Sequence, residues 1–456
     1  MSLLQLAKAL TVFYGKRTTV TRPAMSTTKF KVHEHIVPAS HVRELPNALA
    51  VEENTPDATL HLAVKQYVPI NNPDPKPGDI NIIALHSNTF TKELYEPLWD
   101  DLLDALPAGT DIKSIWIADI AQQGASYVLN EEKLADGASW DDHSRDLLLM
   151  INHFRDQMTA PMIGIGHSMG GTQLIGLCRI HPRLFHAVAF LDGWFAADYQ
   201  SLDPKGFWKR GTSRKDRFRS LDVARKGYEK VPVFKAWDRR VFERYMAAGF
   251  RDLPTMLHPD GEGVALTTPT AMEMSTATRS NIDEINVKPK EATRLDRLTY
   301  PDMAYDLSLK WPYYVKQPRT AGRYLPYLRP RALFLYGSKG SMARPEWQKA
   351  NIEHTGTSDG GSGGHRLGCV EDGKVDGGHF FPFENPRGTA KVLAPWLATE
   401  AKVWRTEKEE LSKRFRVEKP AEQRQRFPKE YVDITKNWAN DPHAEPAAKP
   451  KKDSKL

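Results

Sequence analysis

One short segment of the chain has the residue types and the spacing for nucleophilic catalysis. Gly166-His167-Ser168-Met169-Gly170-Gly171 follows the apolar run 161–165 and precedes a stretch of helical spacing that begins at Thr172. A serine in a sharp turn between a strand and a helix is exposed, and the flanking glycines let the two elements approach closely. The segment therefore predicts Ser168 as a nucleophile. The N–H of Met169, at the start of the helix, is then one donor of an oxyanion hole.

A serine hydroxyl is a weak nucleophile, so a histidine base and a carboxylate that orients it are expected elsewhere in the chain. His379 lies in the glycine-containing stretch 376–382 and is predicted to be the base. Asp192 directly follows the apolar residues 189–191 and is predicted to be the acid, because the end of a strand can aim a carboxylate at the histidine. The alternatives that stay open for the acid are Glu346, Asp372 and Asp376.

A second oxyanion donor is expected from the loop after the apolar run 82–85, which reads His86-Ser87-Asn88-Thr89-Phe90. The backbone N–H of Asn88 is the predicted donor. Losing one such hydrogen bond typically slows catalysis on the order of a hundredfold or more. Three aromatic residues next to the predicted site are expected to contact the substrate, namely Phe90, Trp194 and Phe195.

An alternation of strands and helices must position these residues. Short β-rich runs predict strands at residues 61–68, 80–85, 115–118, 162–165, 188–191 and 332–336. Between several of them, apolar residues recur at helical spacing. The pattern predicts an α/β fold, with a mostly parallel central sheet and helices on both faces. The stretch between Leu191 and Ala332 is too long for an ordinary connection and is predicted to be a large helical lid.

Composition and charge exclude several classes of protein. The 456 residues include 64 Lys and Arg against 57 Asp and Glu, for a net charge of +7, and the excess positive charge lies at the two ends. No RRM, zinc-finger or helix-turn-helix signature accompanies it, so nucleic-acid binding is not expected. The longest wholly apolar run, residues 147–151, is too short for a transmembrane segment. Two cysteines, Cys178 and Cys369, support neither a disulfide scaffold nor a metal site.

The two ends of the chain carry different targeting patterns. The tripeptide Ser454-Lys455-Leu456 matches a peroxisomal import signal, and a Lys-rich stretch before it would present it to an import receptor. Residues 1–24 contain no acidic residue and weakly resemble a mitochondrial presequence, with Met25 as an alternative start. Because the C-terminal signal is the more specific, we expect the protein in the peroxisome matrix.

The chain resembles the α/β-hydrolases, and among them the fungal peroxisomal α/β-hydrolases of toxin and secondary-metabolite pathways, closest to the acyl-CoA hydrolases of that group. Besides the motifs at Ser168 and His379, residues 92–99, 143–154 and 360–364 carry the resemblance. It implies hydrolysis through an acyl-enzyme. In the family the acid follows the strand after the nucleophile, which corresponds to Asp192. Ser87 and Thr89 depart from the family pattern, because glycines are common at their positions.

We therefore expect five parts in the chain. Residues 1–24 form a dispensable extension, residues 25–193 and 331–418 form the hydrolase core, residues 194–330 form the lid, and residues 419–456 form a tail with the import signal.

The expected function is that of a serine hydrolase that cleaves the acyl-CoA thioester of a bulky secondary metabolite. Basic residues of the lid between positions 205 and 219 would meet the phosphates of coenzyme A. A peroxisomal lipase or carboxylesterase of the same fold is the alternative, and a non-catalytic binding protein is a third reading. Epoxide hydrolases and dehalogenases are disfavoured, because they need a carboxylate where Ser168 stands. No metal or organic cofactor is implied, and the sequence is compatible with a homo-oligomer.

Overall fold

A computed structural model describes residues 27–52, 55, 58–195, 209, 211–280, 293–301, 313–340, 344–415 and 419–437. The chain divides into two units, Met1–Ala401 and Lys402–Leu456. The predicted extension 1–24 and the tripeptide 454–456 lie outside the described residues. The second unit contains the end of α15 and the helices α16 (Ala421–Arg424) and α17 (Lys429–Asn437). None of the helices in the described ranges combines the length and apolar character needed to cross a membrane.

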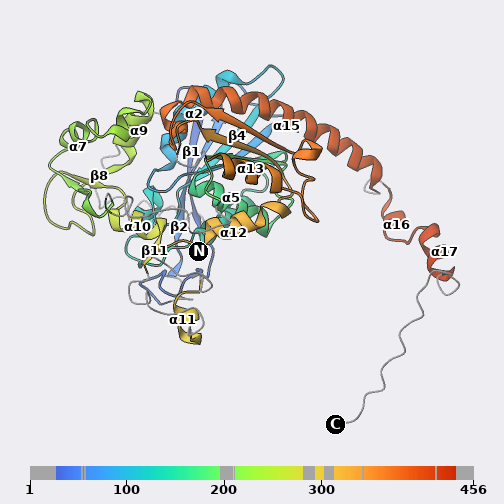
Figure 1. The fold of residues 1–456 in the computed structure, drawn as a ribbon, viewed down its shortest axis with the longest axis horizontal. Coiled ribbons are helices and arrows are strands. Elements are labelled where there is room, and N and C mark those ends of the chain that lie inside the picture. The colour runs from blue at the N-terminus through green and yellow to red at the C-terminus, as the bar shows by residue number, and fades with distance from the viewer. Residues whose placement is uncertain are drawn as a thin grey trace, which may run out of the picture. The chain divides into compact units, whose positions relative to one another are not determined.

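The first unit is built on an eight-stranded sheet in the order β1-β2-β4-β3-β5-β6-β12-β13 (Figure 1). From β4 to β13 all neighbours are parallel, whereas β1 and β2 add to one edge in antiparallel fashion. The strands are β1 (Phe30–Pro38), β2 (His61–Pro69), β3 (Ile80–Leu85), β4 (Ile112–Ala118), β5 (Met162–His167), β6 (Ala187–Leu191), β12 (Arg331–Gly337) and β13 (Val370–Val375). Because parallel strands end at the same edge, the loops after β3, β5, β6 and β13 are brought together there.

The six predicted strands are present as β2, β3, β4, β5, β6 and β12, with slightly different ends. The two strands at the edges of the sheet, β1 and β13, are not among the predictions. Each of them carries polar residues on an exposed face and therefore has no continuous apolar run. A central strand such as β3 is buried along its whole length, which makes it visible in the sequence.

Helices cover both faces of the sheet (Figure 1). The main covering helices are α2 (Glu96–Ala105), α4 (Trp140–His153), α5 (Met169–Ile180), α12 (Gln317–Tyr324) and the part of α15 (Pro386–Arg414) that belongs to the first unit. Ile82 and Ala84 of β3 face the core that contains α2 and the first part of α15, whereas Ile83 and Leu85 face the core that contains α4, α5 and α12. This alternation follows the two-residue period of a strand. The shorter helices of the core are η2 (Lys92–Tyr95), α3 (Gly124–Asn130), η5 (Leu325–Tyr327), α13 (Pro345–His354), η6 (His365–Leu367) and α14 (Phe381–Glu384).

A large insertion separates β6 from β12, and Figure 1 shows α7, α9 and α10 grouped at one side of the sheet. Its described elements before α12 are β7 (Arg217–Phe218), α7 (Leu221–Tyr228), α8 (Pro232–Lys235), α9 (Arg239–Ala248), β8 (Phe250–Asp252), β9 (Val264–Leu266), α10 (Thr270–Ala277), β10 (Arg279–Ser280), α11 (Arg294–Thr299) and β11 (Tyr313–Tyr314). Three arginines of the insertion form ion pairs with carboxylates of the core, namely Arg240–Asp101, Arg244–Glu96 and Arg251–Glu131. These pairs fix the insertion to α2 and to the end of α3.

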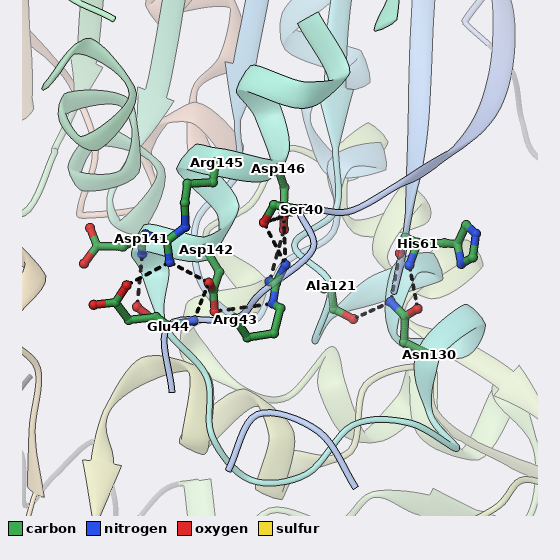
Figure 2. A network of polar contacts seen from close by, with 11 residues as sticks. Ser40, Arg43, Glu44, His61, Ala121, Asn130, Asp141, Asp142, Arg145 and Asp146 are labelled. Atoms are coloured by element: carbon green, nitrogen blue, oxygen red, sulfur yellow. Dashed lines mark hydrogen bonds and ion pairs between the residues drawn. The ribbon is translucent and has the colours of Figure 1, made fainter. Parts of the chain in front are cut away.

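A buried ion-pair network joins the segment after β1 to α4 (Figure 2). Arg43 donates through Nη1 and Nη2 to the two carboxylate oxygens of Asp146, at 2.8 and 3.1 Å, and both side chains are almost completely buried. The N–H of Ser40 donates to the same carboxylate at 2.8 Å, and the N–H of Glu44 donates to Asp142 at 2.9 Å. The network holds α4 in place, and α4 in turn packs against α5, the helix that begins at the predicted nucleophile.

We expect Arg43→Met to lower the free energy of unfolding by about 3–5 kcal/mol, because it leaves the buried carboxylate of Asp146 without its cation. Urea denaturation at neutral pH measures this. The matched control is Lys339→Met, which removes an ion pair to Asp376 of the same 2.8 Å separation whose side chains are 70% and 74% exposed. This control should cost less than about 1 kcal/mol. Equal losses in the two variants would contradict the structural role of the buried pair.

Candidate active site

The turn between β5 and α5 holds Ser168 in an unusual backbone conformation. Its φ is +53° and its ψ is −115°, and its side chain is half-buried. A Cβ on Gly166 would lie 2.5 Å from the carbonyl oxygen of Gly170, and a Cβ on Gly170 would lie 2.3 Å from that of Leu85. Side chains at either position would collide with the backbone, which is the physical reason for the glycines of the motif.

The predicted base and acid lie within hydrogen-bonding distance of one another and of the serine. His379 Nε2 is 2.8 Å from Ser168 Oγ, and His379 Nδ1 is 2.8 Å from Asp192 Oδ2. The other carboxylate oxygen of Asp192 accepts a hydrogen bond from the N–H of Gly337 at 3.3 Å, and the side chain is fully buried. With Nδ1–H donated to Asp192, Nε2 can accept the proton of Ser168. The three residues are thus brought together, and their catalytic roles remain predictions.

The alternative carboxylates lie elsewhere. Glu346, Asp372 and Asp376 are all exposed, and Asp376 forms an ion pair with Lys339. The loop after β12 has glycine where this acid could otherwise stand, and a Cβ on Gly340 would lie 3.0 Å from Asp192 Oδ2. The carboxylate that reaches His379 is therefore that of Asp192, at the end of β6. It occupies space that a residue larger than Gly340 would fill.

Both predicted oxyanion donors lie in the expected elements. Met169 is the first residue of α5, and Asn88 lies in the loop after β3. In the part of the chain that the structure describes, nothing accepts a hydrogen bond from the backbone N–H of either residue. The N–H groups on both sides of Asn88 are engaged, by Tyr95 Oη at 2.9 Å and by Gln123 Oε1 at 3.0 Å. The Asn88 N–H is therefore available to a ligand oxygen, whereas the N–H groups of Ser87 and Thr89 already donate hydrogen bonds.

Backbone strain is concentrated in these loops. Within the described ranges, the non-glycine residues with a positive φ are Thr89, Ser168 and Asp192, at +78°, +53° and +46°. Such conformations cost on the order of 1–3 kcal/mol each and persist only where the surrounding structure imposes them. All three belong to the predicted nucleophile, acid and oxyanion loop, as expected if this edge of the sheet is the functional site.

A chain of buried hydrogen bonds connects the three loops of the site. The N–H of Ser87 donates to Tyr95 Oη, the Tyr95 hydroxyl pairs with His167 Nδ1 at 2.8 Å, and His167 Nε2 pairs with the carbonyl oxygen of His379 at 3.0 Å. Burial raises the pKa of Tyr95, so its hydroxyl keeps the proton that it donates to His167. Burial also lowers the pKa of His167 to about 3, so the imidazole is neutral and donates from Nε2. The chain sets the spacing between the oxyanion loop, the nucleophile turn and the histidine loop.

Phe90 lies between the core and the insertion. It is buried, with its ring centroid 4.9 Å from that of Trp237 in the insertion and 5.2 Å from that of Phe380 in the histidine loop. This places Phe90 beside the base in an apolar environment. Substrate contact by Phe90 stays a prediction.

The other two predicted substrate residues follow Asp192 in the chain. Trp194 is half-buried, its ring lies 5.7 Å from that of Trp140, and it packs in the cluster that contains Met169. Phe195 is buried and packs against Phe190 at 5.0 Å, inside the core. Phe195 therefore has a packing role of its own, whereas Trp194 borders the predicted oxyanion hole.

The basic residues of the insertion are only partly described. Lys205 and Arg210 lie outside the described residues. Arg214 forms an ion pair with Glu273 of α10, and burial raises the pKa of that glutamate to about 7 although the arginine opposes the shift. Over the described ranges, no group of three or more His, Cys, Asp or Glu side chains is placed to hold a metal ion.

Three residues that organise the site, Tyr95, Gln123 and His167, are not among the sequence predictions. His167 stands next to the nucleophile and could have drawn attention there. Tyr95 and Gln123 act across the fold, and no local pattern marks them.

The histidines buried in neutral form make a prediction about pH. Burial lowers the pKa of His143, on α4, to about 3, as it does for His167. In the unfolded chain a histidine has a pKa of about 6.5, so below that pH the unfolded state binds more protons and the free energy of unfolding falls as pH falls toward about 3. Each histidine contributes up to about 1.4 kcal/mol per pH unit.

We therefore expect His143→Gln to flatten the slope of unfolding free energy against pH, measured by urea titrations below about pH 6. His167→Gln should flatten it by a similar amount. A slope identical to that of the wild type would mean that His143 is protonated in the folded state.

Similar proteins identify the family of the chain and its fold. No protein-family model matches the chain. A protein named type I acyl-CoA thioesterase mpaH' from Penicillium brevicompactum is 36% identical over 440 residues, which cover 91% of this chain and 95% of the relative. A type I acyl-CoA thioesterase mpaH from Penicillium roqueforti (strain FM164) is 35% identical, with the same two coverages.

Among solved structures, the peroxisomal α/β-hydrolase Lpx1 of Saccharomyces cerevisiae is similar with a TM-score of 0.58 at 16% identity, over 91% of this chain and 97% of that chain. This similarity confirms the predicted fold class, and the two Penicillium relatives confirm the predicted resemblance. The protein is an enzyme of the hydrolase class. The chain belongs to the family of the fungal type I acyl-CoA thioesterases, within the α/β-hydrolases.

Proposed function

We propose that this enzyme hydrolyses the acyl-CoA thioester of a bulky metabolite through a covalent acyl-enzyme on Ser168. The observation that carries the proposal is the hydrogen-bonded chain from Ser168 through His379 to Asp192, with 2.8 Å between the atoms of each pair. The names of the Penicillium relatives support a coenzyme A thioester as the substrate class.

In the first half of the reaction, His379 Nε2 takes the proton of Ser168 while Oγ attacks the thioester carbonyl carbon. Asp192 stabilises the imidazolium that forms, and it does so at no reorganisation cost because its carboxylate is already buried against Nδ1. The N–H groups of Met169 and Asn88 bind the oxyanion. Collapse of the intermediate breaks the C–S bond, and His379 returns its proton to the departing thiolate.

In the second half, a water molecule replaces the thiol. His379 accepts one proton of this water as its oxygen attacks the acyl carbon, and the same two N–H groups bind the second oxyanion. Collapse releases the carboxylic acid, and the proton returns to Ser168 Oγ. One thioester and one water thus yield one acid and one thiol, with no redox change.

We expect Ser168→Ala to reduce release of coenzyme A from an acyl-CoA by about 10⁶-fold, because the alanine cannot form the acyl-enzyme. Release of the free thiol, followed with a thiol-reactive chromophore, measures this. Ser338→Ala is the matched control, since Ser338 is an exposed serine beside the same loops. It should retain activity within about threefold. Turnover by Ser168→Ala at the wild-type rate would overturn the proposal.

The same assay tests the substrate class. With benzoyl-CoA, p-nitrophenyl butyrate and a triglyceride as probes, kcat/KM should be highest for the CoA thioester. If Ser168-dependent turnover instead favours the ester or the glyceride, the enzyme is a carboxylesterase or lipase of this fold.

We also propose that the enzyme acts in the peroxisome matrix. The support is the tripeptide Ser454-Lys455-Leu456, together with the name of a yeast relative, peroxisomal membrane protein LPX1, which is 29% identical over 117 residues. In fungal cells, the full chain with a fluorescent protein at its N-terminus should co-localise with a matrix marker. Deleting residues 454–456 should leave it in the cytosol, whereas deleting the three residues 446–448 should not. Peroxisomal fluorescence of the chain without 454–456 would contradict the proposal.

A further inference from the structure

The oxyanion loop has a feature that its sequence does not explain. Thr89 has a φ of +78°, a conformation that glycine adopts freely and that a β-branched residue adopts only under constraint. The residue before it, Asn88, carries the proposed oxyanion donor. Some group must therefore hold the peptide between these two residues in its strained orientation.

The side-chain amide of Gln123 contacts both residues. Its Oε1 accepts a hydrogen bond from the N–H of Thr89 at 3.0 Å, and its Nε2 donates to Asn88 Oδ1 at 2.7 Å. Gln123 is almost completely buried, which limits the access of water to both bonds. The Nδ2 of Asn88 is held as well, by Thr89 Oγ1 at 3.1 Å and by the carbonyl oxygen of Glu273 at 3.3 Å.

The backbone of Gln123 is itself fixed. Its N–H donates to the carbonyl oxygen of Ile120 at 2.9 Å, and its carbonyl oxygen accepts from the N–H of Tyr127 at 3.1 Å. Asp119, just before this loop, accepts hydrogen bonds from the N–H of Lys92 and from that of Ala125, both at 2.9 Å. The carboxylate therefore ties the far end of the oxyanion loop to the helix that begins beside Gln123.

We propose that Gln123 is a positioning residue for the oxyanion hole, whose amide holds Asn88 and Thr89 so that the Asn88 N–H points toward the reacting carbonyl. The proposal rests on the proposed function, because it assigns this N–H to an oxyanion. Gln123 holds the side chain of Asn88 and the N–H that follows it, and Tyr95 holds the N–H that precedes it, which restricts the directions in which the Asn88 N–H can point. We call the two hydrogen bonds of the Gln123 amide the clamp. The clamp holds Thr89 in a conformation that glycine would adopt freely at this position.

The test compares Gln123→Met with Gln122→Met. Methionine has a similar length and removes both hydrogen bonds, and Gln122 is a neighbouring buried glutamine whose amide has no partner within the described residues. With benzoyl-CoA and p-nitrophenyl butyrate, Gln123→Met should lower kcat by about 10- to 100-fold, less than the full loss of an oxyanion donor, while KM changes by less than about threefold. Gln122→Met should leave kcat within about threefold.

Two further measurements separate positioning from a general packing defect. A trifluoromethyl ketone forms a tetrahedral adduct with the serine, so Gln123→Met should weaken its binding by the same factor as it lowers kcat/KM. In the Gln123→Met background, Thr89→Gly should restore kcat by about tenfold, because glycine accepts φ +78° without a clamp. If Gln123→Met does not fold, Asn88→Ala serves instead, since it removes the side-chain bonds and keeps the backbone N–H; it should show the same split between kcat and KM.

The outcomes are distinct from those for the proposed function. An unchanged kcat in the clamp variants, an equal loss in Gln122→Met, or no rescue by Thr89→Gly would overturn the role of Gln123, while Ser168→Ala still abolishes turnover. Turnover that survives Ser168→Ala would overturn the proposed function and the clamp together.

Discussion

The reversal of the chain at Ser168 is the constraint on which the rest of the site depends. The chain changes from strand β5 to helix α5 at a single residue, Ser168. This residue therefore has a strained φ of +53°. The turn is possible only because Gly166 and Gly170 have no side chains. A Cβ on Gly166 would collide with the carbonyl oxygen of Gly170, and a Cβ on Gly170 would collide with that of Leu85. The loop after β3 is therefore in backbone contact with the nucleophile turn. In consequence, this contact fixes the start of the oxyanion loop relative to the nucleophile turn.

The position of the acid follows from the register of the sheet. His167 pairs with Leu191, so the residue after each strand lies at the same edge, and the N–H of Ser168 donates to the carbonyl oxygen of Leu191 at 3.0 Å. Asp192 thus begins its turn directly beside the nucleophile. Its positive φ directs the carboxylate across the end of β12, where Gly337 supplies an N–H and Gly340 supplies space. An acid at the end of β12 would compete for the volume that the Asp192 carboxylate occupies.

How much of this could be predicted from the sequence depends on the distance over which each residue acts. Ser168 is marked by glycines within three residues, and Asp192 by the apolar run that ends just before it. Gln123 and Tyr95 carry no such mark, because their partners Asn88 and His167 lie 35 and 72 residues away. The strand β3 is buried on both faces and is visible as a continuous apolar run, whereas the edge strands β1 and β13 are half-exposed and are not. Local pattern thus predicts candidates for the reacting groups and misses the residues that hold them in place.

The insertion contacts the segment after His379 through Trp237 and Asp238, which lie against Phe383, and it contacts the oxyanion side separately. Its helix α10 reaches the oxyanion side of the core, since the carbonyl oxygen of Glu273 accepts from the Asn88 side chain and that of Thr276 accepts from Trp140 Nε1 at 2.6 Å. The side-chain hydrogen bonds of the triad, in contrast, join loops that follow β5, β6, β12 and β13. A displacement of α10 would therefore disturb the loop that holds Asn88 before it disturbs Ser168, Asp192 and His379. Substitutions in the insertion that shift the backbone of α10 would reach the oxyanion loop through the hydrogen bond between Asn88 and Glu273.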